Sequence, residues 1–269
     1  MTRYAPMFAR LESEVAFVPF LVLGDPDAET SFELIRALIR GGADALELGI
    51  PFSDPVADGP VIQAAATRAL AGGARIDDAW SLLASIRDDH SDIPIGLLTY
   101  ANLVLNRTPE SFYRSARESG VDSVLIADLP LQETASVDSV ALEHGVAPVH
   151  IAPPNADDAK LEAIAQATRG YVYVTSRPGV TGVDDTLHGD SAALIAKLKR
   201  FGAPPAMLGF GIARPAHVVQ AARLGAAGAI SGSAVVRHVE RNLGDRRAMI
   251  ASVEAFVREM KGATKVKVG

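Results

Sequence analysis

The sequence has 269 residues, of which 48% are hydrophobic, and a formal net charge of -6 at pH 7. This composition allows a sizeable core and argues against a nucleic-acid-binding surface, which needs a basic face. Because the chain has no cysteine, disulfides, thiolate nucleophiles and cysteine-bound metals are excluded. The N-terminus does not resemble a signal peptide and no apolar run reaches the roughly 18 residues of a membrane helix, so we expect a cytoplasmic protein.

Short apolar runs alternate with longer amphipathic stretches along the chain. The short runs predict strands, and the stretches with a three-to-four-residue period predict helices. The eight predicted strands cover residues 16–25, 44–50, 93–101, 122–128, 147–152, 170–176, 205–211 and 227–233. The predicted helices cover residues 27–42, 61–90 with a break at Gly72 and Gly73, 108–120, 132–145, a stretch capped by Asn155, 190–202, 213–225 and 244–261. Thr108, followed by Pro109, is a typical helix N-cap.

Eight strands, each followed by a helix, in about 250 residues are typical of a TIM barrel. An open, doubly wound sheet is the alternative, but the first strand ends in LGDPD and lacks the glycine-rich turn of such folds. We therefore predict an α/β fold, a single (β/α)₈ TIM-barrel domain over residues 1–269 with extra N-terminal and loop helices. The active site of this fold lies at the carboxyl ends of the strands.

Glu47 is the most informative residue at that end. In the strand 44–50, Leu46, Leu48 and Ile50 share one face, while Glu47 lies between Ala45 and Gly49 on the face that should point into the barrel. Burial should raise the pKa of this carboxyl and make it a usable general acid or base near neutrality. The structural alternative is a buried glutamate that is satisfied by a neighbouring Tyr or Asn.

The loop PFSDPVADGP, residues 51–60, follows this strand. Asp58 could face the same ligand as Glu47. Asp54 precedes Pro55, and an aspartate in that position is more often a turn residue. We therefore expect chemistry from Asp58 and turn formation from Asp54.

Glycine-containing turns follow the last three predicted strands, at 179–182, 209–211 and 231–233. Phosphate on a TIM barrel is often held by the loops after strands seven and eight and by the start of a short extra helix. Glycines let backbone N–H groups approach an anion, and the Ser233 hydroxyl can donate as well. The alternative is that these glycines only permit tight turns.

The positions of the basic residues narrow the reaction class. All six lysines lie on predicted helices or in the C-terminal tail, which argues against a Schiff-base aldolase. The histidines lack paired metal-ligand spacing, which argues against a metal aldolase. His150 is best interpreted as a satisfied core histidine. Carboxylate acid–base chemistry on a phosphorylated substrate is what is left.

The sequence resembles the tryptophan synthase α chain family from Arg3 to about Ala263. The resemblance rests on the runs AFVPFLVLGDP, GADALELGIPFSDPVADGPVIQ, IPIGLLTYANLV, GVDSVLIADLP, PPNADD, RGYVYVTSRPGVTG, GFGI and GAAGAISGSAVV. The pattern LELGxPFSDPxADGP is highly specific to this family.

The resemblance implies tryptophan synthase, an enzyme of the carbon–oxygen lyase class, whose alpha reaction cleaves a C–C bond of indole-3-glycerol phosphate by a retro-aldol step and gives indole and glyceraldehyde 3-phosphate. It implies that Glu47 transfers protons, that Asp58 hydrogen-bonds the indole N–H, and that the catalytic Tyr173 lies near both. The substrate-binding residues that it implies are Phe20, Leu98, Tyr100, Leu125, Ile151, Thr181, Gly182, Phe210, Gly211, Gly232 and Ser233.

The resemblance also implies a partner, the tryptophan synthase β subunit, in an α₂β₂ heterotetramer in which indole passes to the β subunit for L-tryptophan synthesis. Pro51 and Asp54 match interface positions. Pyridoxal phosphate belongs to that partner, so we expect no cofactor and no metal in this chain. Val22, Pro178 and the acidic stretch after Gly182 depart from the family pattern and concern loop dynamics and subunit coupling rather than the reaction.

Three alternatives differ from this interpretation. The first is a stand-alone indole-3-glycerol phosphate lyase that releases free indole. The second is another phosphate-binding barrel, an isomerase or synthase, in which PFSDPVADGP would have no role. The third is a non-catalytic activating subunit, against which the joint presence of Glu47, Asp58 and Tyr173 argues.

Overall fold

The computed structural model describes residues 2–12, 14–175, 190–209 and 211–265. The strands are β1 Ala16–Val22, β2 Leu46–Gly49, β3 Ile95–Thr99, β4 Ser123–Ile126, β5 Ala147–Pro148, β6 Ile151–Ala152, β7 Val172–Thr175, β8 Ala206–Gly209 and β9 Gly228–Ser231. The helices are α1 Tyr4–Leu11, α2 Ala28–Arg40, α3 Pro60–Ala71, α4 Ile76–Asp89, α5 Ala101–Leu105, α6 Pro109–Glu118, η1 Leu131–Glu133, α7 Ala135–Glu143, α8 Asp158–Ala167, α9 Asp190–Arg200, α10 Pro215–Arg223, α11 Ser233–Glu240 and α12 Arg246–Gly262.

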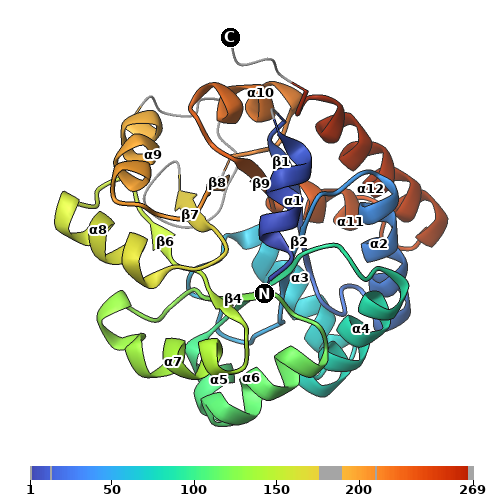
Figure 1. Ribbon diagram of the computed structural model, residues 1–269. Coiled ribbons are helices and arrows are strands. Elements are labelled where there is room, and N and C mark those ends of the chain that lie inside the picture. The colour runs from blue at the N-terminus through green and yellow to red at the C-terminus, as the bar shows by residue number, and fades with distance from the viewer. Residues whose placement is uncertain (1, 13, 176–189, 210, 266–269) are drawn as a thin grey trace.

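The strands form one parallel sheet in the order β5-β4-β3-β2-β1-β9-β8-β7-β6. β5 and β6 are two halves of the predicted fifth strand, and they pair with β4 and β7 respectively. Between the halves, Val149 N donates to Val124 O at 3.0 Å and Tyr173 N donates to His150 O at 3.1 Å. The fifth strand therefore joins the two edges of the sheet, and the predicted (β/α)₈ barrel is confirmed (Figure 1).

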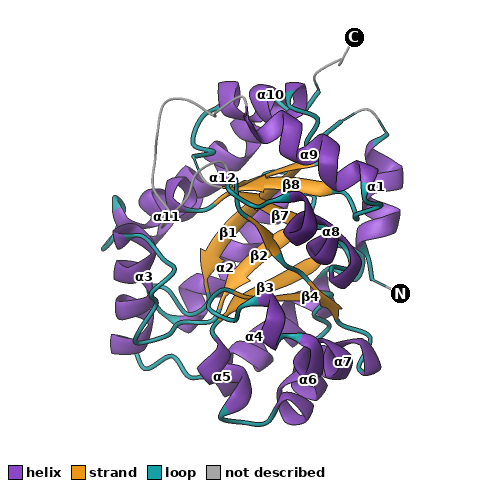
Figure 2. Ribbon diagram, turned by 90° about the vertical axis from the view of Figure 1, so that its left-hand side faces the viewer, coloured by secondary structure: helices purple, strands orange, loops and turns teal. Residues whose placement is uncertain are grey.

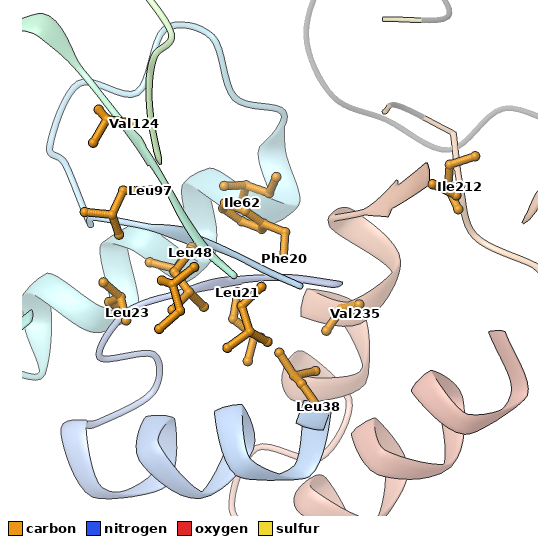
Figure 3. Packing of buried hydrophobic residues seen from close by; sticks show 14 of the residues in the cluster. Phe20, Leu21, Leu23, Leu38, Leu48, Ile62, Leu97, Val124, Ile212 and Val235 are labelled. Carbon is orange, nitrogen blue, oxygen red and sulfur yellow. The ribbon is translucent and has the colours of Figure 1, made fainter. Parts of the chain in front are cut away.

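Alternation along the strands separates two apolar layers. Leu21 and Leu48 face outward and pack with Leu38 of α2 in the layer between the strands and the helices (Figure 3). Ala45, Tyr171 and other inward-facing residues form a second cluster inside the barrel. Burying one leucine side chain stabilises the fold by about 1.5–3 kcal/mol, and the outer layer contains many buried leucines.

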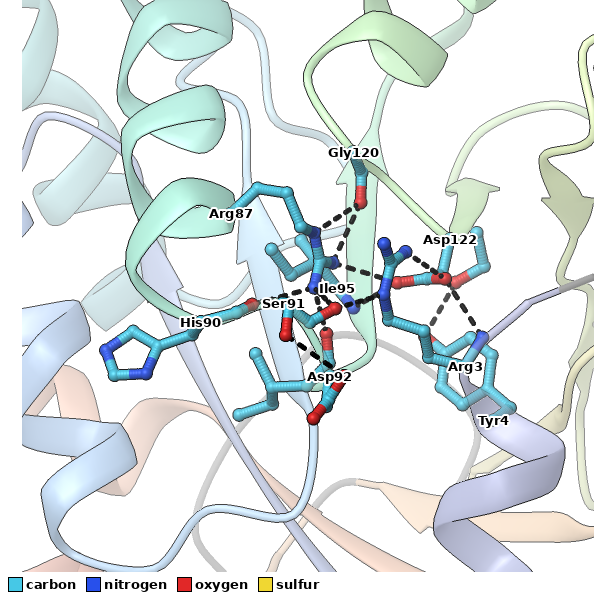
Figure 4. A network of polar contacts seen from close by, with 11 residues as sticks. Arg3, Tyr4, Arg87, His90, Ser91, Asp92, Ile95, Gly120 and Asp122 are labelled. Carbon is cyan, nitrogen blue, oxygen red and sulfur yellow. Dashed lines mark hydrogen bonds and ion pairs between the residues drawn. The ribbon is translucent and has the colours of Figure 1, made fainter.

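Helix α1 closes the amino-terminal end of the barrel, opposite α3 and α11 (Figure 2). The Tyr4 hydroxyl lies 2.8 Å from the hydroxyl of Ser123, where β4 begins. The nearby Asp122 carboxylate accepts from the Arg3 and Arg87 guanidinium groups at 3.0 and 3.1 Å (Figure 4). Removing one cationic partner would leave a buried carboxylate incompletely paired, which costs free energy of folding. These contacts therefore hold the amino-terminal end of the barrel in place.

Local predictions agree with the structure at most helix ends. Thr108 accepts from the Ser111 backbone N–H, as predicted, and the break at Gly72 and Gly73 separates α3 from α4. The prediction that Asn155 caps the next helix was wrong. Asp157 is the N-cap of α8 and accepts from Lys160 N at 2.8 Å, because residues 153–156 first form a turn.

The short helices α5 and α11 lie in segments for which only loop helices in general were predicted. Helix α11 begins directly after β9, so its first residues stand at the carboxyl end of the barrel. Within the described parts of the chain, no helix is long and apolar enough to span a membrane.

Candidate active site

One cavity opens at the carboxyl ends of the strands, and its lining is mostly apolar. Ten of the predicted catalytic and substrate-binding residues line it: Phe20, Glu47, Asp58, Leu98, Leu125, Ile151, Tyr173, Gly211, Gly232 and Ser233. The remaining lining residues were not singled out from the sequence: Ala57, Ile62, Ala127, Ile212, Ala213, Ile230 and Ala234. The predicted residues Thr181, Gly182 and Phe210 lie outside the described residues.

Glu47 is placed in the cavity by β2, as its strand alternation predicts, and only 1% of the residue is exposed. The Tyr171 hydroxyl donates to its Oε2 at 2.5 Å. Its Oε1 is buried and has no hydrogen-bond partner among the described residues. Burial raises the pKa of Glu47 to about 7, while the hydrogen bond from Tyr171 acts in the opposite direction.

Tyr171 is a contact that sequence reasoning missed. It immediately precedes β7, two residues before Tyr173, so both side chains point to the same face of the chain. That alternation was the available signal. The structure thus combines the two interpretations of Glu47, as a general acid or base and as a buried glutamate satisfied by a tyrosine. Oε2 accepts from Tyr171, whereas Oε1 has no partner among the described residues.

Asp58 lies at the end of the loop that follows β2, with 6% of the residue exposed. The Tyr100 hydroxyl donates to its Oδ2 at 2.7 Å and accepts from Ala57 N at 3.3 Å. The Tyr100 ring also stacks on Phe52, with ring centroids 5.1 Å apart. Burial raises the pKa of Asp58, and the hydrogen bond from Tyr100 partly offsets this rise.

Tyr100 therefore lies behind Asp58 and is not among the described residues that line the cavity. Its hydroxyl contacts Ala57 and Asp58 at the end of the loop 51–60, and its ring stacks on Phe52 at the start of the same loop. Tyr100 contacts Oδ2, and within the described parts of the chain no hydrogen bond is seen at the other carboxylate oxygen of Asp58.

Apolar side chains form the walls of the cavity around the two carboxyl groups. Phe20, Leu98 and Leu125 come from β1, β3 and β4, and β2 with Glu47 lies between β1 and β3 in the sheet. Tyr173, which is 7% exposed, lies opposite them on β7, and its hydroxyl would collide with a side chain at Gly209. Such walls suit a flat aromatic ligand and keep water away from the carboxyl groups.

Two backbone segments border the cavity at its other end. Gly211 to Ala213 follow β8, and Gly211 has a φ of +78°, a conformation that favours glycine. Gly232 and Ser233 lead into α11. The first N–H groups of a helix have no partners within the helix and carry partial positive charge, so this end of the cavity suits an anion.

The two predicted interface residues differ in exposure. Asp54 is exposed at the tip of the loop 51–60, whereas Pro51 is buried and lines a second cavity beside Gly24 and Leu82. Next to Asp54, Val56 is 71% exposed, and Leu105 of α5 is 52% exposed. The exposed Val56 lies on the same loop as Ala57 and Asp58, which line the cavity.

The other candidate chemistry does not converge on this cavity. None of the described lysines lines it. His150 Nε2 lies 3.1 Å from the Asp138 carboxylate of α7, so this histidine is satisfied, as predicted, but outside the barrel interior. Among the described residues, no three His, Asp or Glu side chains are grouped to hold a metal ion. The site combines a protonatable carboxyl, a second carboxyl group, apolar walls and an end that suits an anion.

Comparisons with known proteins agree with the resemblance noted in the sequence. The sequence model of the family described as "Tryptophan synthase alpha chain" matches residues 8–265. A protein of that description from Cronobacter sakazakii is 52% identical over 266 residues, covering 98% of this chain and 99% of its own. One from Escherichia coli is 52% identical over 267 residues, covering 98% and 100%.

Solved structures give the same result. Tryptophan synthase from Mycobacterium tuberculosis matches with a TM-score of 0.89 and 27% identity, covering 98% of this chain and 99% of its own. A chain of the tryptophan synthase α₂β₂ complex from Pyrococcus furiosus matches with a TM-score of 0.81 and 33% identity, covering 93% and 98%.

Proposed function

The chain belongs to the tryptophan synthase alpha chain family, and from this premise we propose that it cleaves indole-3-glycerol phosphate to indole and glyceraldehyde 3-phosphate in a single barrel domain. The observation that carries the proposal is Glu47, a carboxyl buried in an apolar cavity whose pKa is raised to about 7. Such a group can both give and take a proton near neutral pH.

Glu47 acts first as an acid. In its protonated form it gives a proton to C3 of the indole ring, which makes the ring an indolenine cation and hence a good leaving group. The resulting carboxylate then takes the proton of the hydroxyl on the adjacent glycerol carbon. A C=O bond forms there, the C–C bond breaks, and its electron pair restores the neutral indole, so Glu47 ends protonated as it began.

Asp58 stabilises the cation that this sequence creates. Its carboxylate oxygen that does not contact Tyr100 accepts from the indole N–H, where positive charge develops. Phe20, Leu98 and Leu125 hold the ring, and Tyr173 packs near both carboxyl groups. Ile151 completes the wall on the same side as Tyr173.

The phosphate of the substrate is bound at the end of the cavity formed by Gly211, Gly232 and Ser233. Backbone amides at the start of α11 and the Ser233 hydroxyl are the donors available there. Thr181, Gly182 and Phe210 belong to the same proposal through the family resemblance.

A β subunit is the proposed partner, in an α₂β₂ assembly, and pyridoxal phosphate is assigned to that subunit. Asp54 and the exposed Val56 lie on the loop 51–60, which also carries Ala57 and Asp58 of the cavity, and a partner bound to this loop could receive indole. A pyridoxal phosphate enzyme needs a lysine for the Schiff base, and no described lysine lines the cavity. The match to a chain of an α₂β₂ complex favours this assembly over a stand-alone lyase.

Indole release from indole-3-glycerol phosphate tests the proposal, measured with and without a tryptophan synthase β subunit. We expect release by the chain alone and faster release with the β subunit. Asp58→Asn should lower kcat in both conditions by about a hundredfold, because it removes the charge that stabilises the cation. Release that is absent in both conditions would refute the activity, and release that the β subunit does not change would support the stand-alone enzyme.

A further inference from the structure

The hydroxyl of Ser231 connects the two backbone segments that border the anion-binding end of the cavity. Ser231 is the last residue of β9 and directly precedes Gly232 and Ser233. It is fully buried, does not line the cavity, and donates from Oγ to Ile212 O at 2.7 Å. The main chain of Ser231 thus leads into Gly232 and Ser233, while its side chain holds the segment 211–213 through Ile212.

The peptide between Ile212 and Ala213 is held at both of its ends. Its carbonyl accepts from Ser231, and its N–H donates to Nδ1 of the buried His217 at 3.2 Å. The C=O and N–H of a trans peptide point in opposite directions. These two hydrogen bonds therefore fix the rotation of this peptide about the chain.

This orientation matters because Gly211, Ile212 and Ala213 all line the cavity. A carbonyl oxygen turned toward an anion would repel it, whereas an N–H would attract it. The carbonyl of Ile212 instead points at Ser231, which does not line the cavity. We propose that Ser231 is a positioning residue for phosphate binding, which keeps this carbonyl away from the anion and sets the segment 211–213 opposite the start of α11.

The inference rests on the proposed phosphate site, and its test is Ser231→Ala. We measure kcat, KM for indole-3-glycerol phosphate, and the inhibition constant of inorganic phosphate. Loss of one buried hydrogen bond should raise KM and the phosphate inhibition constant by about five- to tenfold. The value of kcat at saturating substrate should stay within about twofold, because Ser231 does not contact the carboxyl groups.

Thr168→Val is the matched control. The Thr168 hydroxyl is also fully buried and also donates to a backbone carbonyl, Ile164 O, at 2.7 Å, but at the end of α8. Both variants should lose similar stability in thermal unfolding, whereas only Ser231→Ala should weaken phosphate binding. If Ser231 had a purely structural role, the phosphate inhibition constant would change by the same factor in Ser231→Ala and Thr168→Val, or would change in neither variant. His217→Ala releases the same peptide from its other end and should also weaken phosphate binding.

The outcomes separate this inference from the proposed function. In one outcome, phosphate inhibits the wild type, Ser233→Asp abolishes this inhibition, and the phosphate inhibition constants of Ser231→Ala and His217→Ala equal that of the wild type. This outcome would overturn the role of Ser231 and leave the phosphate site in place. Equal phosphate inhibition in the wild type and in Ser233→Asp would remove the phosphate site itself, and the inference with it.

Discussion

The hydroxyl of Tyr171 donates to the Glu47 carboxylate at 2.5 Å, although the two residues are 124 positions apart in the sequence. The bond favours the ionised form of Glu47, while burial favours the neutral form and has the larger effect. The balance between these two causes places the pKa of Glu47 at about 7, where one group can act as acid and then as base.

Tyr171→Phe should shift the pH dependence of cleavage. The proposed reaction starts from protonated Glu47, so kcat/KM of the wild type should fall as pH rises through about 7. Removing the hydrogen bond destabilises the carboxylate, raises the pKa of Glu47, and moves this alkaline limb to higher pH. The measurement is kcat/KM from pH 5 to 9.5. Tyr113→Phe, at a buried tyrosine of α6 away from the cavity, is the control and should leave the limb in place.

Tyr100→Phe should act on the opposite limb. The variant keeps the ring that stacks on Phe52 and loses only the hydroxyl that donates to Asp58. Since the proposed mechanism needs Asp58 as a carboxylate, and the hydrogen bond from Tyr100 lowers the pKa of Asp58, the acid limb should move to higher pH. We also expect kcat to fall about tenfold, because a bond to a charged group is lost. An acid limb at the wild-type position would contradict the role given to Tyr100.

Gly96→Ala should disturb Glu47 directly. A Cβ at this position would lie 2.7 Å from Glu47 Oε2 and 3.0 Å from both the Ser123 Oγ and the Tyr4 hydroxyl. Glu47 would have to move, and displacement of a reacting group by about 1 Å can cost roughly a hundredfold in rate. Steady-state kinetics should show a lower kcat. The control is Gly262→Ala, where a Cβ meets nothing within 4 Å, and normal kcat in Gly96→Ala would show that the carboxylate is not held as described.

Stability should depend on pH through Glu47. Below about pH 4.5 the group is protonated in both the folded and the unfolded chain; between 4.5 and about 7 only the unfolded chain releases the proton, so the free energy of unfolding falls. The full loss is roughly 3 kcal/mol and is reached above pH 7. Glu47→Gln avoids this loss, so its advantage over the wild type in urea unfolding should grow by roughly 2–3 kcal/mol from pH 5 to pH 8. An advantage that does not change with pH would mean that the pKa of Glu47 is near its ordinary value.

Much of the fold follows from patterns of short range. The eightfold alternation predicts the barrel, and the period of two along β2 turns Glu47 inward while Leu46 and Leu48 pack outside. The error at Asn155 has a local cause. Two candidate caps, Asn155 and Asp157, lie two residues apart, and the turn at 153–156 decides between them.

The contacts of the site that were not predicted depend on segments that are distant in the sequence. The position of Tyr100 behind Asp58 and the bond from Ser231 to Ile212 arise only when separate loops meet at one end of the barrel. The start of helix α11 at Ser233 was not predicted, because residues 231–233 were interpreted as the end of a strand and a glycine-containing turn. Tyr171 could have been found, since strand alternation places it on the same face as Tyr173.

Glu47→Gln in single-turnover cleavage of indole-3-glycerol phosphate tests the central claim most directly. Glutamine has nearly the shape of glutamate but cannot transfer the proton. The account predicts a loss of cleavage of at least a thousandfold, with the inhibition constant of inorganic phosphate and binding to the β subunit unchanged. Cleavage by Glu47→Gln at the wild-type rate would contradict it.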